Sequence, residues 1–144
     1  MIIEITPDKQ KAEALIKMAN VTLKRLKTIN EENYPSNTLV DYYDTIHKLL
    51  EAITLQTGIK IRGEGGHQEL IDYVAKKHKL NEQTRQFLQQ LRDYRNRISY
   101  EGFMITKNFI HTNKQSIKYI INKLFEETNK QTKSSRNQMN QKKF

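Results

Sequence analysis

The stretch LVDYYDTIHKLLEAI, residues 39–53, decides the fold because its apolar side chains recur at three- and four-residue steps. This spacing is the period of one face of an α-helix. The side chains on that face are Leu39, Tyr42, Tyr43, Ile46, Leu49, Leu50 and Ile53. We therefore predict a helix over residues 38–57, whose tyrosines pack in a core. Gly58 suits the C-terminal cap, where glycine adopts a left-handed backbone conformation at little cost.

Four further segments show the same helical period, two of them long and two shorter. They cover residues 7–29, 67–78, 82–99 and 106–128. Only residues 2–5 have the character of a strand, and that segment is too short to found a sheet. The sequence predicts an all-α fold, an antiparallel bundle of about five helices joined by mostly short links.

Start and stop signals support these helices. Thr6 followed by Pro7 favours a helix start, and Asn81 suits the N-cap of the fourth helix. Gly102 lies where a helix-ending glycine is expected. The polar link over residues 30–37 contains a proline and is typical of a loop.

The composition excludes several classes of site. The chain has 144 residues, a usual size for one domain, and no cysteine. Disulfides, zinc–thiolate sites and cysteine nucleophiles are therefore excluded. No stretch is apolar enough to cross a bilayer, and the start of the chain does not resemble a signal peptide. We expect a cytoplasmic protein that does not interact with membranes.

The net charge of +9 is concentrated at the C-terminus. Residues 128–144 hold no acidic and five basic side chains, which leaves about +4 for residues 1–127. The basic residues are Lys130, Lys133, Arg136, Lys142 and Lys143. We predict a helical domain over residues 1–127 and a disordered tail over residues 128–144. The tail either contacts nucleic acid without sequence preference or is a solvated segment that aids solubility.

The stretch LRDYRNRISYEG, residues 91–102, places three arginines within six residues. Helical spacing puts Arg95 at the edge of the buried face and turns Arg97 well away from it. An arginine at the edge of a core must be paired or must face a cleft. Two interpretations stay open: an ion pair with Asp93 or with a glutamate elsewhere, or an anion-binding site.

This stretch resembles the signature of the HEPN family, in which an Arg is followed after four to six residues by a His near the end of a late helix. Arg95 and its polar neighbour Asn96 match the signature, and Tyr100 stands in the His position. The ending Tyr-Glu-Gly is similar to HEPN variants that carry Tyr-x-Gly. Residues 42–58 and 66–70 resemble the second and third helices of the family, so the resemblance covers about residues 39–102.

Many HEPN proteins resemble metal-independent ribonucleases in which the Arg and His of two subunits converge in a cleft. The resemblance implies a homodimer, no metal and no cofactor. It assigns catalytic candidates, Arg95, Asn96 and Tyr100, and candidates for contact with nucleic acid, Arg92, Arg95 and Ser99. The charge of the tail adds Lys130, Lys133 and Arg136 to the candidates for contact with nucleic acid. Tyrosine, with a pKa of about 10, is a poor base at neutral pH. Tyr100 should therefore contact a phosphate or stack on a base, which keeps binding and removes most acid–base catalysis.

Helix geometry constrains this site. Residues five apart on a helix point roughly 140° away from each other. Arg95 and Tyr100 can meet only if the helix ends between them or if two subunits share the site. In some HEPN toxins a nucleotidyltransferase partner modifies a Tyr two residues beyond the His, where this chain has Gly102. A nucleotidyltransferase antitoxin partner stays a possibility, but that control mechanism does not carry over.

Three functions remain open from the sequence. The first is a noncatalytic RNA- or nucleotide-binding relative of the ribonucleases of toxin–antitoxin and defence systems. The second is an active metal-independent endoribonuclease in which another group replaces the His. The third is a structural module that binds a partner protein. His47, His67, His78 and His111 show no metal-ligand spacing. We expect His67 to be structural and His47 to be a half-buried hydrogen-bonding residue.

Overall fold

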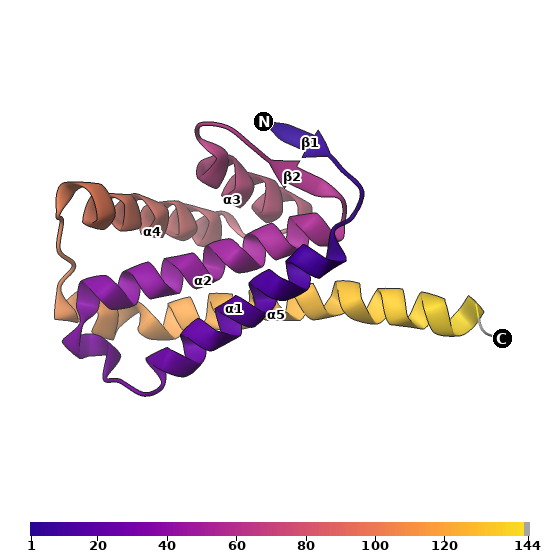
Figure 1. Ribbon diagram of the computed structural model, residues 1–144. Helices are drawn as coiled ribbons and strands as arrows, with labels where there is room; N and C mark the ends of the chain where they lie inside the picture. Colours follow the sequence, from indigo (N-terminus) through magenta and orange to yellow (C-terminus); the bar gives the residue numbers. More distant parts are fainter. Residues whose placement is uncertain (143–144) are drawn as a thin grey trace.

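In the computed structural model, the backbone of residues 1–142 and the side chains of residues 1–130 are described (Figure 1). This part of the chain forms five α-helices, one short 3-10 helix and two short strands. In chain order they are β1 (Ile2–Glu4), α1 (Lys9–Leu26), η1 (Glu31–Asn33), α2 (Pro35–Gln56), β2 (Ile59–Ile61), α3 (Gly66–Lys77), α4 (Glu82–Glu101) and α5 (Lys107–Lys142). The predicted all-α fold is confirmed.

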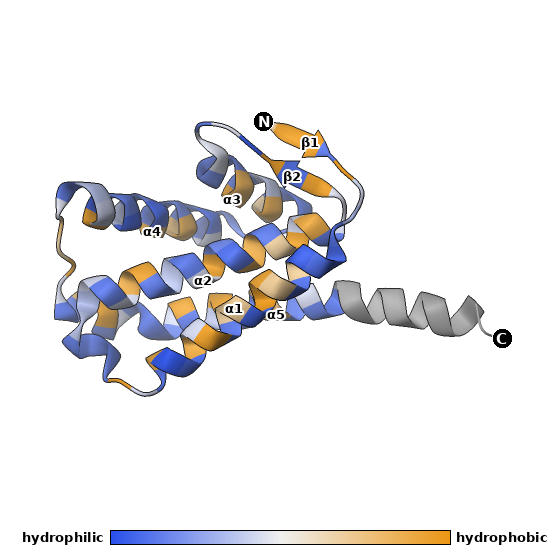
Figure 2. Ribbon diagram, viewed as in Figure 1, coloured by the Kyte–Doolittle hydropathy of each residue, from blue (hydrophilic) through white to orange (hydrophobic). Residues whose placement is uncertain are grey.

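Helix α2 lies at the centre, and each of the other four helices packs against it. Every member of the predicted apolar stripe of α2 is buried, including both tyrosines, which confirms their assignment to the core. Helix α4 differs, because only Leu88 and Leu91 are buried along its 20 residues. Figure 2 shows this contrast: α4 is mostly hydrophilic, whereas hydrophobic residues recur along α2.

The helix boundaries confirm some of the predicted signals and correct others. The side chain of Asn81 accepts a hydrogen bond from the backbone N–H of Thr84 at 2.7 Å, as a cap should. The cap of α1 is Asp8, not Thr6, because only the carboxylate of Asp8 reaches the free amide of Lys11. Pro35 was expected in a loop but begins α2, where its fixed φ suits the first helical turn.

A two-stranded antiparallel sheet closes the end of the molecule next to α3, and the sequence prediction missed it. Ile2 pairs with Ile61, and Glu4 pairs with Ile59. Each strand has three residues, too few for a recognisable alternation, and the pairing partners lie more than fifty residues apart in the sequence. Gly58 starts the return of the chain from α2 into β2 and has the expected positive φ, +81°.

We expect the change Gly58→Ala to destabilise the protein by about 1–2 kcal/mol, because an L-residue is strained in the left-handed region. A Cβ at this position would also lie 2.6 Å from the backbone oxygen of Ile5. Gly63→Ala is the matched control, since Gly63 also has a positive φ but no atom within 4 Å of its Cβ position. Urea unfolding should show the larger loss for Gly58→Ala; equal losses would contradict the role of the close approach.

Helix α5 carries the chain beyond the boundary that the sequence predicted at residue 127. Thr128 is buried, and its carbonyl oxygen accepts a hydrogen bond from Gln56 Nε2 at 3.3 Å. The packed body therefore includes Thr128, and helical backbone continues to Lys142 where a disordered tail was expected. The side chains of residues 131–144 lie outside the described part, so the division into a domain and a basic tail stays a prediction. Within the described residues, no helix combines the length and apolar character that a membrane span requires.

Candidate functional site

Arg95 lies on the side of α4 that faces α2, and it is neither free nor fully neutralised. Its Nε is 3.3 Å from Oδ1 of Asp44, and the two side chains are 23% and 36% exposed. The sequence suggested Asp93 or a glutamate as the partner, which is wrong, because the carboxylate comes from α2. The Nε atom is buried but makes no hydrogen bond, so the pair lacks the geometry of a strong charge-assisted contact.

Arg92 lies one helical turn before Arg95 on a neighbouring part of the same face. It is half-buried, and its Nε donates a hydrogen bond to Oε1 of Gln89 at 2.8 Å. Among the described residues it forms no ion pair with a carboxylate. Arg95 therefore has a carboxylate partner, Asp44, whereas the partner of Arg92 is a neutral amide. We name the surface formed by Arg92 and Arg95 the arginine face.

A pair of histidines lies beside the arginine face. The rings of His47, from α2, and His67, from the first turn of α3, stack with centroids 4.0 Å apart. Tyr43 stacks with both at 6.2 Å, and its hydroxyl is 3.3 Å from Nδ1 of His67. Tyr43 and His47 share a face because they are four residues apart on a helix. Gly65, at φ +71°, turns the chain so that α3 begins next to α2.

Both histidines are biased toward the neutral form. Burial lowers the pKa of His47 to about 4, and the charges of neighbouring bases add to this effect. The pKa of His67 is also lowered, first by burial and then by the charges of Arg95 and Arg92. Burial raises the pKa of Tyr43 to about 12, although the same two arginines oppose the shift. Near pH 7 the cluster is therefore two neutral imidazoles and a phenol beside two permanent cations.

A small cavity of about 150 Å³ adjoins the histidine pair. His47 and His67 line it, with Lys60 of β2 and the glycines at the start of α3. A small polar group can therefore approach the two rings. Glu51 also lines this cavity, whereas Arg92 and Arg95 do not.

A match to a known family adds to this geometry. The family model described as the HEPN domain matches residues 12–128, which include α2, α3, α4 and most of α1. This chain belongs to the HEPN family. HEPN is an all-α, ribonuclease-like family associated with RNA and nucleotides, and its domains often dimerise. No curated protein and no solved structure shows significant similarity to the chain.

The HEPN motif residues do not converge within this chain. Helix α4 continues to Glu101, so it does not end between Arg95 and Tyr100. Tyr100 is 80% exposed, whereas Arg95 is mostly covered. Asn96 is half-buried and Ser99 is exposed, both close to Arg95 in sequence. Of the two ways in which Arg95 and Tyr100 could meet, only a site shared between subunits remains.

The remaining arginine of the stretch 91–102 and the basic residues of the tail are placed less favourably for binding an anion. Arg97 points away from the arginine face, as expected, and its guanidinium lies 4.1 Å from the ring centroid of Phe103 and 3.5 Å from Glu101. Lys130 pairs with Glu127 at 3.1 Å. Lys133 and Arg136 lie outside the residues whose side chains are described. The candidate site within one chain therefore consists of the arginine face and the rings of Tyr43, His47 and His67.

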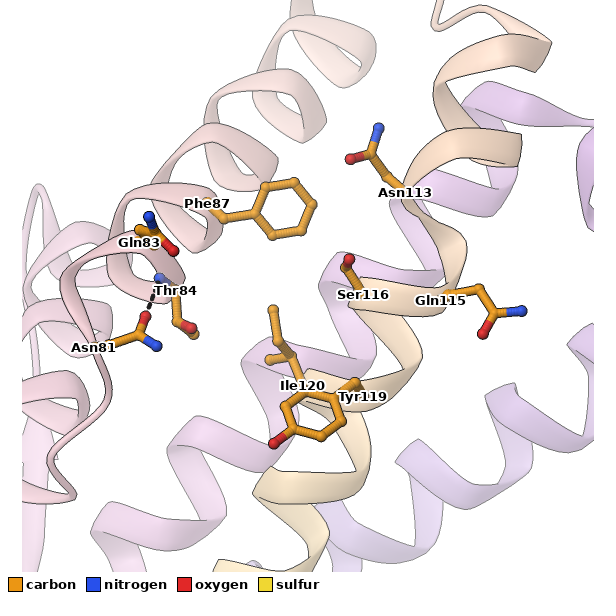
Figure 3. Close-up of a pocket in the computed structure, with 9 residues that line it drawn as sticks. All are labelled: Asn81, Gln83, Thr84, Phe87, Asn113, Gln115, Ser116, Tyr119 and Ile120. Carbon is orange, nitrogen blue, oxygen red and sulfur yellow. Dashed lines mark hydrogen bonds between the residues drawn. The ribbon is translucent and has the colours of Figure 1, made fainter.

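A groove between α4 and α5 is a second feature of this HEPN domain, with a volume of about 530 Å³. Figure 3 shows Phe87 on one side of it and Ile120 on the other, surrounded by amide and hydroxyl side chains. These polar residues are Asn81, Gln83, Thr84, Asn113, Gln115 and Ser116. The groove lining contains no charged side chain. It therefore lacks the cations that a phosphate requires, and the arginine face is the better candidate for an anion.

Proposed function

We propose that this HEPN protein binds RNA, and that the arginine face of α4 holds a phosphate of the RNA backbone. The observation that carries the proposal is the unbalanced charge of this face: Arg92 has only an amide partner among the described residues, and Arg95 is only loosely paired with Asp44. The Nε of Arg95 is buried toward Asp44, so a phosphate would contact the exposed part of this side chain, which is 23% accessible. The planar guanidinium fork matches the oxygens of a phosphate and can bind two of them at once.

The neutral rings beside the arginines also suit an RNA ligand. An imidazole or a phenol can donate a hydrogen bond to a phosphate or to a 2′-hydroxyl without adding negative charge. The rings of Tyr43 and His47 cover part of the imidazole of His67, but the residue as a whole is exposed, so a ligand at the arginine face can reach it. Binding of this kind needs no proton transfer and does not depend on Tyr100. The homodimer and the nucleotidyltransferase partner stay predictions, because one chain is described.

We expect Arg95→Ala to weaken binding of a short single-stranded RNA about tenfold and to lower the slope of log Kd against log salt concentration by about one. The double change with Arg92→Ala should lower the slope by about two. Fluorescence anisotropy on the full chain, over a series of salt concentrations, measures both quantities. Cations of the tail contribute equally to every variant and cancel in the comparison.

Arg97→Ala is the matched control, because it removes the same charge from the same helix but from a guanidinium already held by Phe103 and Glu101. It should change Kd less than threefold. Asp44→Asn removes the competing carboxylate and should tighten binding. If Arg95→Ala and Arg97→Ala have equal effects, or neither has any, the arginine face is not the RNA site. Such a result would favour the structural module.

A further inference from the structure

The histidine pair offers a proton acceptor at the place where the arginine face would hold a phosphate. His67 lies in the first turn of α3, and its Nδ1 is 3.3 Å from the Tyr43 hydroxyl. Within the described part of the chain, its Nε2 has no hydrogen-bond partner. If Nδ1 donates to the Tyr43 oxygen, the lone pair of Nε2 is free to accept a proton. The stacked ring of His47 fixes the plane of the imidazole.

Burial and the cations that face His67 lower its pKa and favour its neutral form, and two carboxylates oppose them. From α4 come Arg92 and Arg95, whose charges lower its pKa. From α2 come the opposing carboxylates of Asp44 and Glu51, together with the neutral Tyr43 and His47. Lys60 of β2 lines the same cavity. A base that is unprotonated near pH 7 and lies beside two phosphate-binding cations is the arrangement that attack by a ribose hydroxyl requires.

We propose that His67 is the general base of a metal-independent RNA cleavage at the arginine face, in place of the motif histidine that is Tyr100 here. This inference rests on the proposed RNA binding. His67 Nε2 takes the proton of a 2′-hydroxyl, the O2′–P bond forms and the P–O5′ bond breaks. Arg92 and Arg95 neutralise the charge that develops on the phosphate oxygens, and the leaving O5′ takes a proton from water. The products are a 2′,3′-cyclic phosphate and a 5′-hydroxyl end.

Tyr43 and His47 act on this reaction through His67 and are positioning residues. When the Tyr43 hydroxyl accepts the hydrogen bond of Nδ1, it stabilises the tautomer whose Nε2 is basic, and His47 holds the ring by stacking. Tyr43 is buried and His47 is half-buried, whereas His67 is exposed. His67 is therefore the side chain whose loss should separate chemistry from binding.

The test uses the purified full chain, a single-stranded RNA and the same sequence with 2′-O-methyl groups, in the presence of a chelator. We expect the wild type to cleave only the RNA and to leave cyclic phosphate ends. His67→Gln should lower the rate by about 10²–10⁴-fold with Kd changed less than threefold. His111→Gln is the control, because His111 is an exposed histidine of α5 paired with Glu32, and it should keep the wild-type rate.

Two further readouts exclude a merely structural role for His67. The wild-type rate should rise with pH and then level off as His67 loses its proton, and His67→Gln should lack this limb. Added imidazole should partly restore cleavage by His67→Ala. If the wild type binds RNA through Arg95 without cleaving it, or if His67→Gln cleaves normally, the inference is overturned while the binding function stands. If Arg95→Ala leaves RNA binding unchanged, the proposed function falls, and this inference falls with it.

Discussion

Leu50→Ala should lower the free energy of unfolding by about 2–5 kcal/mol. Leu50 is fully buried in α2, and it belongs to the cluster in which side chains of all five helices meet. Removing its three terminal carbons loses apolar burial and leaves a cavity that surrounding helices cannot fill without moving. Because small domains are stable by only about 5–15 kcal/mol, this loss is a large part of the total.

The control for Leu50→Ala is Met104→Ala, which also shortens an apolar side chain of similar volume. Met104 is 78% exposed, so its loss should change the free energy of unfolding by less than about 0.5 kcal/mol. Urea titration followed by circular dichroism gives both values. A loss below about 1 kcal/mol for Leu50→Ala would mean that α2 is not the centre of the core.

Acidification from pH 7 to pH 5 should cost about 2 kcal/mol of stability, mainly through His47. Burial lowers the pKa of His47 in the folded protein to about 4, from 6.5 in the unfolded chain. Protonation therefore favours the unfolded chain. The contribution of His47 is fully present above pH 6.5 and is lost as the pH falls toward 4. The lowered pKa of His67 adds an effect of the same sign in the same range.

Protonation of carboxylates changes the stability mainly below this pH range. The pKa values of Glu32 and Glu127 are lowered, so the stability they provide is lost only below about pH 4.5. Urea unfolding at pH 7 and pH 5 should therefore show most of the loss for the wild type and much less for His47→Gln. A ring titration of His47 by NMR should have its midpoint near pH 4; a midpoint near 6.5 would rule out this account.

The sequence predicted those parts of the fold whose signals are local. The apolar stripe from Leu39 to Ile53 is buried as expected. It could be predicted because the helical period depends only on residues close together in the sequence. Arg95 at the edge of the buried face and Arg97 turned away follow from the same period. The cap at Asn81 and the left-handed Gly102 depend on one or two residues each.

The site could be predicted only in part, because its contacts join distant residues. Asp44 lies 51 positions before Arg95 in the chain, and no local pattern indicates that pair. His47 and His67 were considered singly, although their stacking depends on the turn between α2 and α3. The one available signal was that His47 follows Tyr43 by one helical turn on the same face. The position of Tyr100 also required the structure, since α4 continues past it.

The sparse anchoring of α4 has a consequence for energetics. Leu88 and Leu91 are its only buried side chains, yet it carries both arginines, while the rings of the site belong to α2 and α3. An RNA bound to the arginines of α4 and to the rings of α2 and α3 would hold α4 against the other two helices. Ligand binding would then stabilise the fold: a free ligand concentration of a hundred times Kd raises the free energy of unfolding by about 2.7 kcal/mol.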